Sequence, residues 1–272
     1  MEKSRMCPNC RAFISTHDRV CAYCNTEVAP RVVRRAPSDA FAGAIPHARF
    51  LTILILLINT GLYVATVVAN MRASGAAPYA DLDGRILFDF GAKYAPAIAG
   101  GQWWRLITAG FLHGGMLHIL MNMWVLFDLG AQVEEFYGGA RFLLIYLISN
   151  ITGFTASLYL LPALSIGASA ALFGLIGAMI AMGVRERSSR GSAIRSFYMR
   201  WAIYGLVLSL IPGTDWAAHL GGITGGFIVG FIVGLPGYSA AMERVMQIGA
   251  GVMVAITGLA FYDMLINLLS LR

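Results

Sequence analysis

Charged residues are scarce in this chain of 272 residues. Asp, Glu, Lys and Arg make up 12% of the sequence, whereas hydrophobic residues make up 58%. Soluble proteins carry about 25% charged residues, so this composition cannot supply a fully soluble surface. Most of the chain is therefore expected to be solvated by lipid. The same composition excludes a disordered chain, a collagen, a coiled coil and a small secreted disulfide scaffold.

Cysteine is absent after residue 24, and the four cysteines form two Cys-x-x-Cys motifs. The pairs Cys7/Cys10 and Cys21/Cys24 are ten residues apart, a spacing that can place four thiolates around one tetrahedral Zn²⁺. A unit this short has no adequate core, so the metal would supply its folding free energy. We predict a cytosolic zinc ribbon over residues 1–28. Two disulfides are the alternative in an oxidising compartment, but no cleavable signal peptide precedes the cysteines.

The rest of the chain divides into a linker and a membrane domain. Residues 29–49 contain three prolines and no apolar period, which is typical of a linker. Residues 50–272 contain seven apolar segments long enough to cross a bilayer. The expected spans are 51–70, 115–133, 141–161, 168–184, 197–212, 217–235 and 246–269. The aromatic-rich segment 71–114 is too polar to span and is expected at the membrane interface.

Arginine sets the expected orientation. Five arginines lie in the predicted loop 185–200, and the N-terminal arm also has an arginine excess. Seven spans place both segments on one side, which the positive-inside rule assigns to the cytoplasm. We therefore expect a multi-pass protein of the bacterial plasma membrane with a cytoplasmic N-terminus. Orientation explains the net charge of +6 better than a nucleic-acid partner does.

Three polar side chains are expected at one depth in the membrane. His118, Ser169 and His219 lie 16 or 17 residues before the predicted inner ends of their spans, which is about 24–26 Å along a helix. The hydrocarbon core is about 30 Å thick, so all three would lie just below the outer surface. Asn122 lies one turn deeper than His118 on the same face. Polar residues within spans are costly and mark candidate functional sites.

The fourth span begins near Ser169 and is too short to reach the outer surface, so its free backbone N–H groups need water or protein partners. A serine at a helix start is usually only a cap, but a recessed helix start beside a hydroxyl also offers a nucleophile and oxyanion donors. His219 could act as its general base. No acidic residue is placed to orient this imidazole, so Phe173 is expected to hold it by stacking.

Glycine recurs every four residues in the sixth span, at Gly222, Gly226, Gly230 and Gly234. Such a ridge lets two helices approach closely. The fourth span offers a matching small face formed by Ala170, Gly174 and Ala178. Packing of these two faces would bring His219 towards Ser169, whereas Ser157 and Ser209 look like ordinary serines within spans.

Several motifs, in this order and spacing, resemble the rhomboid family of intramembrane serine proteases. The resemblance covers about residues 50–270. The motifs are Trp104-Arg105, His113, His118-x-x-x-Asn122, Glu134 in the turn after the second span, Gly167-Ala168-Ser169, and His219 with Gly222 and Gly226. The resemblance implies an all-α bundle of six core transmembrane helices, here with a seventh C-terminal helix. It also implies that the Trp104–Arg105 pair anchors the outer loop at the membrane interface.

The resemblance further implies the roles of the site residues. Ser169 would be the nucleophile and His219 the base, with no metal in the chemistry. The oxyanion site would be formed by His118, Asn122, the backbone N–H of Ser169 and the loop that Gly167 shapes. The family commonly has Gly after the serine, where this chain has Ala170. The extra methyl group of Ala170 would narrow the oxyanion region. Phe173 stands where the family often has Tyr.

The resulting hypothesis is a serine endopeptidase that cleaves single-pass transmembrane proteins within membrane lipid, through an acyl-enzyme intermediate. The zinc ribbon would serve an unidentified cytosolic partner. One alternative is a catalytically inactive rhomboid-like protein that binds transmembrane helices, which Ala170 alone supports. A transporter would require internal repeats and intramembrane charge pairs, and neither is evident. A zinc-dependent sensor or scaffold is the remaining class.

Overall fold

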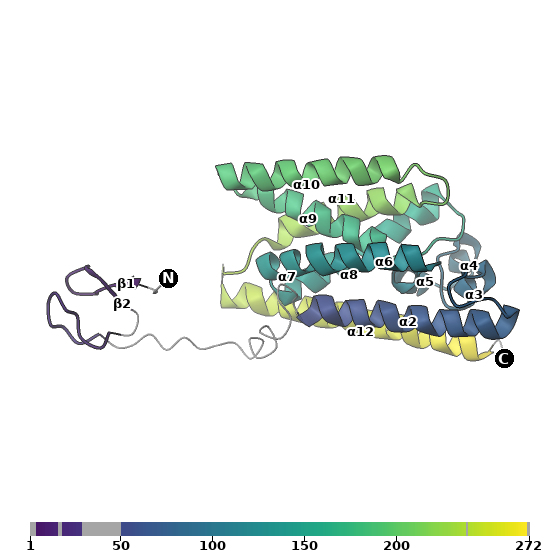
Figure 1. Cartoon of the computed structure of the whole chain (residues 1–272), viewed down its shortest axis with the longest axis horizontal. Coiled ribbons are helices and arrows are strands. Elements are labelled where there is room, and N and C mark those ends of the chain that lie inside the picture. The colour runs from purple at the N-terminus through teal and green to yellow at the C-terminus, as the bar shows by residue number, and fades with distance from the viewer. Residues whose placement is uncertain (1–3, 16–17, 29–49, 238, 271–272) are drawn as a thin grey trace. The chain divides into compact units, whose positions relative to one another are not determined.

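The structure is a computed structural model that describes residues 4–15, 18–28, 50–237 and 239–270 (Figure 1). The chain divides into two compact units, Met1–Gly43 and Ala44–Arg272. The predicted linker over residues 29–49 lies outside the described residues. In the first unit, strands β1 (Ser4–Met6) and β2 (Phe13–Ser15) pair antiparallel.

Seven long helices build the second unit within the described residues, and they correspond to the seven predicted spans. They are α2 (Phe50–Ser74), the continuous run of α6 (Met116–Val125), η2 (Leu126–Gly130) and α7 (Ala131–Tyr137), α8 (Gly139–Leu160), α9 (Ser169–Arg185), α10 (Ser189–Leu208), α11 (Trp216–Val233) and α12 (Ala240–Ser270). Five of them, all except α9 and α10, are long and apolar enough to cross a membrane, and α9 is a shorter apolar helix. The predicted all-α membrane bundle is confirmed.

Helix α10 differs from the predicted fifth span at both ends. We expected a loop over residues 185–200, but α9 ends at Arg185 and α10 begins at Ser189. The Ser188 side chain caps α10 by accepting a hydrogen bond of 3.1 Å from the Gly191 backbone N–H. A capped start satisfies otherwise unpaired N–H groups. The arginines at 190, 195 and 200 therefore lie on the helix rather than in a loop.

Glu134 lies within α7 rather than in a turn after the second span. Its carboxylate accepts hydrogen bonds from the backbone N–H groups of Leu51 (3.2 Å) and Thr52 (2.9 Å) and from the Thr52 hydroxyl (2.8 Å). The carboxylate thus satisfies free N–H groups at the start of α2 and complements the positive end of the helix dipole. This contact ties α2 to α7.

Helices α9 and α11 pack backbone to backbone. The contacting pairs are Gly222 with Ala170, Gly226 with Gly174, and Gly230 with Ala178. A Cβ atom on Gly226 would lie 2.0 Å from the Gly174 carbonyl oxygen, so no side chain fits between the helices there. The predicted match between the glycine ridge and the small face is confirmed over these three pairs. Gly234 instead follows the end of α11, with a φ of 59°.

Residues 75–115 fold over one end of the bundle (Figure 1). They form α3 (Gly84–Asp89), α4 (Ala95–Ala99), α5 (Arg105–Thr108) and the 3-10 helix η1 (Ala109–Phe111). We refer to this end, where α9 and α11 begin, as the loop end. The segment therefore has its own helices and is not a single interfacial element.

The Arg105 guanidinium organises the segment at the loop end. Its Nη1 donates hydrogen bonds to the carbonyls of Phe88 (2.6 Å) and Ala92 (2.9 Å), and the group stacks over the Phe88 ring at 4.0 Å. Burial lowers the pKa of Arg105 to about 10. Trp104 is also buried, whereas Trp103 is exposed. The pair thus anchors the segment through buried contacts inside the protein, and its expected place at the membrane interface stays a prediction.

Candidate active site

Ser169 and His219 are hydrogen-bonded at the loop end of the bundle. Ser169 is the first residue of α9, and His219 lies in the first turn of α11. The Ser169 Oγ atom lies 2.8 Å from His219 Nε2, and the imidazole is buried. The backbone contact between α9 and α11 holds the two helix starts at this separation. The structure thus brings together the two side chains that the sequence singled out.

The loop that leads into Ser169 is held by Lys93. The backbone groups of Lys93 and Ser165 exchange two hydrogen bonds of 2.9 Å. The buried Lys93 ammonium donates to the carbonyls of Leu161 (2.5 Å) and Ala163 (2.7 Å). Burial lowers the pKa of this ammonium. The chain therefore enters α9 in one fixed path.

The start of α11 is fixed by Asp215. One carboxylate oxygen accepts a hydrogen bond of 2.8 Å from the Ala218 N–H, and the other bonds the Ser157 hydroxyl on α8. Asp215 is thus engaged as a helix cap. Its side chain sets the position of the turn that carries His219 without bonding the imidazole.

The other imidazole nitrogen contacts Ser209, for which the sequence predicts only an ordinary serine within a span. The Ser209 Oγ atom lies 2.5 Å from His219 Nδ1 and 2.6 Å from the Gly205 carbonyl oxygen. Ser209 is the C-cap of α10 and is 2% exposed. A serine bonded to the carbonyl four residues earlier resembles any serine in a helix. The sequence pattern around Ser209 therefore did not indicate a contact with His219. The only signal was its place beside the short turn that precedes α11.

Phe173 lies against the imidazole as predicted. The rings of Phe173 and His219 are stacked, with centroids 4.2 Å apart and planes inclined by 18°. Gly205 on α10 makes room for the phenyl ring, because a Cβ atom there would lie 2.6 Å from Phe173 Cζ. The imidazole of His219 is therefore held on one face by Phe173 and at its two nitrogens by Ser169 and Ser209.

Gly167 leaves a space between His118 and the serine. Its φ of +126° is a conformation that side chains rarely adopt. A Cβ atom on Gly167 would lie 2.8 Å from His118 Nε2 and 3.5 Å from Ser169 Oγ. The Gly167 N–H donates to the Ala109 carbonyl at 2.9 Å, which holds the loop against η1. A small group can therefore lie between the serine and the imidazole of His118.

Asn122 is tied to its own helix. Its Nδ2 donates a hydrogen bond of 2.9 Å to the His118 carbonyl oxygen. Asn122 is largely buried, and the His118 ring packs edge-on against His113 with centroids 5.0 Å apart. His118 is therefore the member of the predicted oxyanion group that lies beside Gly167, and Asn122 supports the turn that presents it.

The methyl group of Ala170 lies against α8. A Cβ atom on Gly153 would lie 2.7 Å from the Ala170 Cβ, so the glycine on α8 provides the space that this methyl group occupies. The departure from the family pattern is thus matched by a small residue on the neighbouring helix.

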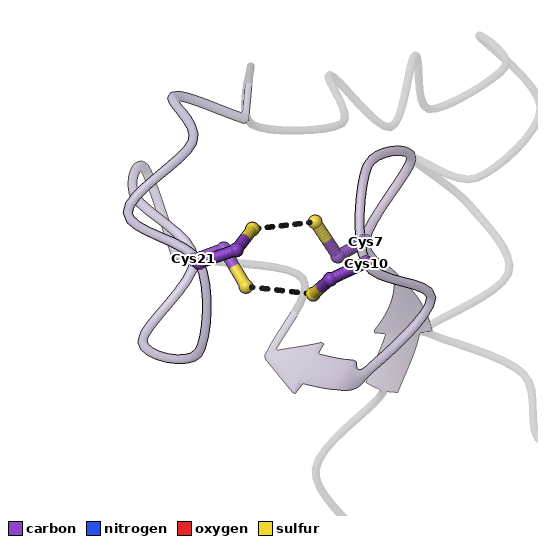
Figure 2. Close-up of side chains that lie close together, drawn as sticks. Cys7, Cys10 and Cys21 are labelled. Carbon is purple, nitrogen blue, oxygen red and sulfur yellow. Dashed lines mark hydrogen bonds between the residues drawn. The ribbon is translucent and has the colours of Figure 1, made fainter.

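The four cysteines of the N-terminal unit form a candidate metal centre. Their Sγ atoms all lie within 4.8 Å of one another. Figure 2 shows Cys7, Cys10 and Cys21 turned towards a common centre. The Cys7–Cys24 and Cys10–Cys21 sulfur distances are 3.6 and 3.7 Å. A tetrahedron with metal–sulfur bonds of about 2.3 Å has edges of about 3.8 Å, so the cluster fits one metal ion.

The two halves of this cluster repeat the same turn. The N–H of Arg11 donates to the Cys7 carbonyl, and the N–H of Asn25 donates to the Cys21 carbonyl, both at 2.9 Å. The Thr26 hydroxyl lies 3.3 Å from Cys24 Sγ and lowers the pKa of this thiol to about 5. A thiolate is the form that binds a metal.

The sequence of this chain is similar to those of several known rhomboid proteins. Rhomboid protease GluP of Bacillus subtilis is 38% identical over 162 residues, which cover 59% of this chain and 32% of that protein. RHOMBOID-like protein 6 of Arabidopsis thaliana is 41% identical over 140 residues, covering 50% and 45%. Rhomboid-like protease 3 of Toxoplasma gondii is 36% identical over 147 residues, covering 52% and 56%. The chain thus spans about a third to just over half of the length of these relatives.

The family model of the Rhomboid domain matches residues 100–236. This range begins before α5 and ends after α11, so it contains every element that carries Ser169, His219 and His118. α2, α12 and the cysteine cluster lie outside it. Because the match covers half of the chain and includes the whole candidate site, the chain belongs to the rhomboid family.

Proposed function

We propose that this protein is an intramembrane serine endopeptidase in which Ser169 is the nucleophile and His219 the general base. The observation that carries the proposal is the 2.8 Å separation of Ser169 Oγ and His219 Nε2. As Oγ attacks the scissile carbonyl, Nε2 takes the hydroxyl proton. The imidazolium then protonates the leaving amine, which leaves an acyl-enzyme. Water, deprotonated by the same nitrogen, hydrolyses this ester and returns the proton to Ser169.

The tetrahedral oxyanion would form in the space beside Gly167. Donors there are the His118 imidazole and the backbone N–H of Ser169 at the start of α9, with Asn122 one turn below. Fixed donors and a helix N-terminus stabilise negative charge strongly in a site of low dielectric constant. The 2.8 Å between His118 Nε2 and a Cβ position on Gly167 supports this assignment.

The substrates would be single-pass transmembrane proteins, cut at the outer part of their spans. Ser169 begins a helix of only 17 residues, and the expected recess of this helix start below the outer surface would suit a peptide bond at shallow depth in the bilayer. Peptide bonds in a stable helix are shielded by their hydrogen bonds, so the substrate must unwind locally. We expect glycine or other helix-weakening residues near the cut.

The protein would lie in a bacterial plasma membrane with its N-terminus in the cytoplasm. The arginines near the junction of α9 and α10 support this orientation by the positive-inside rule. All four cysteines of the chain lie between residues 7 and 24, so labelling of the native cysteines reports on which side of the membrane the N-terminal unit lies. After metal removal, a membrane-impermeant maleimide should label spheroplasts only once they are lysed. Labelling of intact spheroplasts would reverse the orientation.

The cysteine cluster would hold a structural Zn²⁺ in a ribbon over residues 1–28, joined by a linker over residues 29–49 to the membrane domain over residues 50–272. The zinc ion would stabilise the ribbon and take no part in peptide hydrolysis. The ribbon would present a binding surface to a cytosolic partner.

Purified full-length protein in lipid tests the proposal. Wild type should react with a fluorophosphonate probe and cleave a transmembrane reporter. Ser169→Ala should abolish both activities, and His219→Ala should lower them at least about 100-fold. Ser74→Ala is the control for loss of a serine hydroxyl outside the proposed site, because the Ser74 hydroxyl donates to the Asn70 carbonyl on α2 at 2.8 Å.

Equal labelling of wild type and Ser169→Ala would contradict the nucleophile assignment. A wild type that neither reacts nor cleaves would instead identify an inactive rhomboid-like protein that binds transmembrane helices.

A further inference from the structure

Four groups form a continuous chain of hydrogen bonds across three helices. Ser169 Oγ on α9 lies 2.8 Å from His219 Nε2 on α11. The other ring nitrogen, Nδ1, lies 2.5 Å from Ser209 Oγ at the end of α10. The Ser209 hydroxyl in turn donates to the Gly205 carbonyl at 2.6 Å. The chain therefore continues beyond the two proposed catalytic side chains.

The last acceptor fixes the direction of the whole chain. A carbonyl oxygen can only accept, so the single hydroxyl hydrogen of Ser209 is donated to Gly205. Ser209 Oγ is then left as an acceptor, which requires that Nδ1 of His219 carries the hydrogen. In the neutral imidazole Nε2 then has a free lone pair. That lone pair faces the Ser169 hydroxyl, as a general base requires.

The surroundings keep Ser209 in place. Its side chain is 2% exposed, and its backbone N–H donates to the Gly205 carbonyl at 2.9 Å. Phe173 covers one face of the imidazole, with centroids 4.2 Å apart. The ring therefore rotates only by breaking the contact with Ser209 or by losing the stack.

We propose that Ser209 is a positioning residue, which holds His219 as the Nδ1–H tautomer so that Nε2 can take the proton of Ser169. This inference rests on the proposed function and refines it. When the imidazole becomes cationic during acylation, Nδ1 still donates to the same Oγ, so no group has to move. The Ser209–Gly205 pair thus performs the orienting part of the role that a carboxylate has in a Ser-His-Asp triad.

Ser209→Ala and Ser209→Thr, each in the full-length protein, test this role. Loss of the partner that fixes the tautomer of a metal-ligating histidine costs about 10- to 100-fold in activity, and we expect a similar factor for His219. Ser209→Ala should lower kcat by this factor with little change in KM, whereas Ser209→Thr, which retains the hydroxyl, should stay near wild type. Ser74→Ala, which removes a comparable helix-end hydroxyl that donates to the Asn70 carbonyl, should leave kcat unchanged. Thermal unfolding of each variant checks that it is folded.

Nitrogen-15 spectra of His219 give a readout that does not depend on activity. Wild type should show a single Nδ1–H tautomer, and Ser209→Ala should show a mixture. An unchanged tautomer in Ser209→Ala, or a wild-type kcat, overturns the inference even if Ser169→Ala is inactive and the proposed dyad stands. A wild type without protease activity overturns the proposed function, and the spectra then still decide whether Ser209 fixes the tautomer.

Discussion

The phenyl ring of Phe173 is stacked on the imidazole of His219, at a centroid distance of 4.2 Å. Phe173 is one turn below Ser169 on α9, so the helix that supplies the hydroxyl also supplies the surface on which the imidazole rests. A displacement of α9 would therefore carry both partners of His219 together.

Removal of the aromatic face should weaken catalysis. An aromatic stack contributes about 0.5–1.5 kcal/mol beyond burial, so Phe173→Leu should lower kcat about tenfold. Steady-state cleavage of a transmembrane reporter measures this change. Phe231→Leu is the matched control, because Phe231 also stacks on a ring, that of Phe227. A wild-type kcat for Phe173→Leu would show that the stack does not orient the base.

A side chain at Gly167 should close the proposed oxyanion space. In Gly167→Ala the methyl group would lie 2.8 Å from His118 Nε2. Loss of oxyanion stabilisation costs about 100- to 1000-fold in kcat, and we expect a loss in this range. Gly101→Ala is the control that distinguishes loss of the oxyanion space from backbone strain. Gly101 also has a positive φ, of +100°, but no atom lies within 4 Å of its Cβ position. Equal activities of the two variants would argue against an oxyanion site beside Gly167.

A methyl group on the glycine ridge should destabilise the bundle. Gly226→Ala places a Cβ atom 2.0 Å from the Gly174 carbonyl oxygen, and overpacking costs about 1–3 kcal/mol. The melting temperature in detergent should fall accordingly. Gly258→Ala in α12 meets no atom within 4 Å, so its better helix propensity should stabilise the protein by up to about 1 kcal/mol. A neutral Gly226→Ala would contradict the close approach of α9 and α11.

The segment at the loop end should depend on Arg105. Arg105→Lys retains the charge but cannot reproduce the two hydrogen bonds from Nη1, and a hydrogen bond to a charged group is worth about 1.5–3 kcal/mol. We expect faster proteolysis of residues 75–115 and a lower melting temperature. Arg85→Lys, on an exposed position of α3, should behave as wild type. Unchanged proteolysis of Arg105→Lys would show that the guanidinium does not hold the segment.

Chelation should unfold the N-terminal unit and leave the active site intact. Structural zinc contributes about 10–16 kcal/mol of binding free energy in small zinc domains. Phenanthroline should therefore release one Zn²⁺ per chain and expose residues 1–28 to protease. Fluorophosphonate labelling of Ser169 should not change. Loss of labelling on chelation would favour a zinc-dependent regulator over an accessory ribbon.

Residue spacing was sufficient to predict the central contact of the bundle. Glycine at every fourth position has one structural use in a membrane helix, which is close packing, and the matching face on α9 was visible in the sequence. The register of Gly222 on Ala170 was not predicted and comes from the structure. His219 and Ser169 meet because each lies at the start of one of these two helices.

Features that depend on a turn or on a buried ion were not predictable in the same way. The start of α10 was misplaced because its arginines lower the hydropathy, while the cap by Ser188 is a local contact that hydropathy does not report. The burial of Arg105 inside the protein was not predicted, because the family resemblance implied only that the Trp104–Arg105 pair anchors the outer loop at the membrane interface. Ser209 was overlooked because its contact with His219 crosses the turn between α10 and α11, whose geometry the sequence does not specify.

Backbone contact between α9 and α11 has a consequence for how the protein meets bilayers of different thickness. The three close backbone contacts between α9 and α11 oppose sliding and tilting of one helix against the other, so we expect the pair to move as one unit. Hydrophobic mismatch must then be absorbed by α2 and α12, which have 25 and 31 residues and expose most of their surface. Tilting at the periphery would leave the distance between nucleophile and base unaltered.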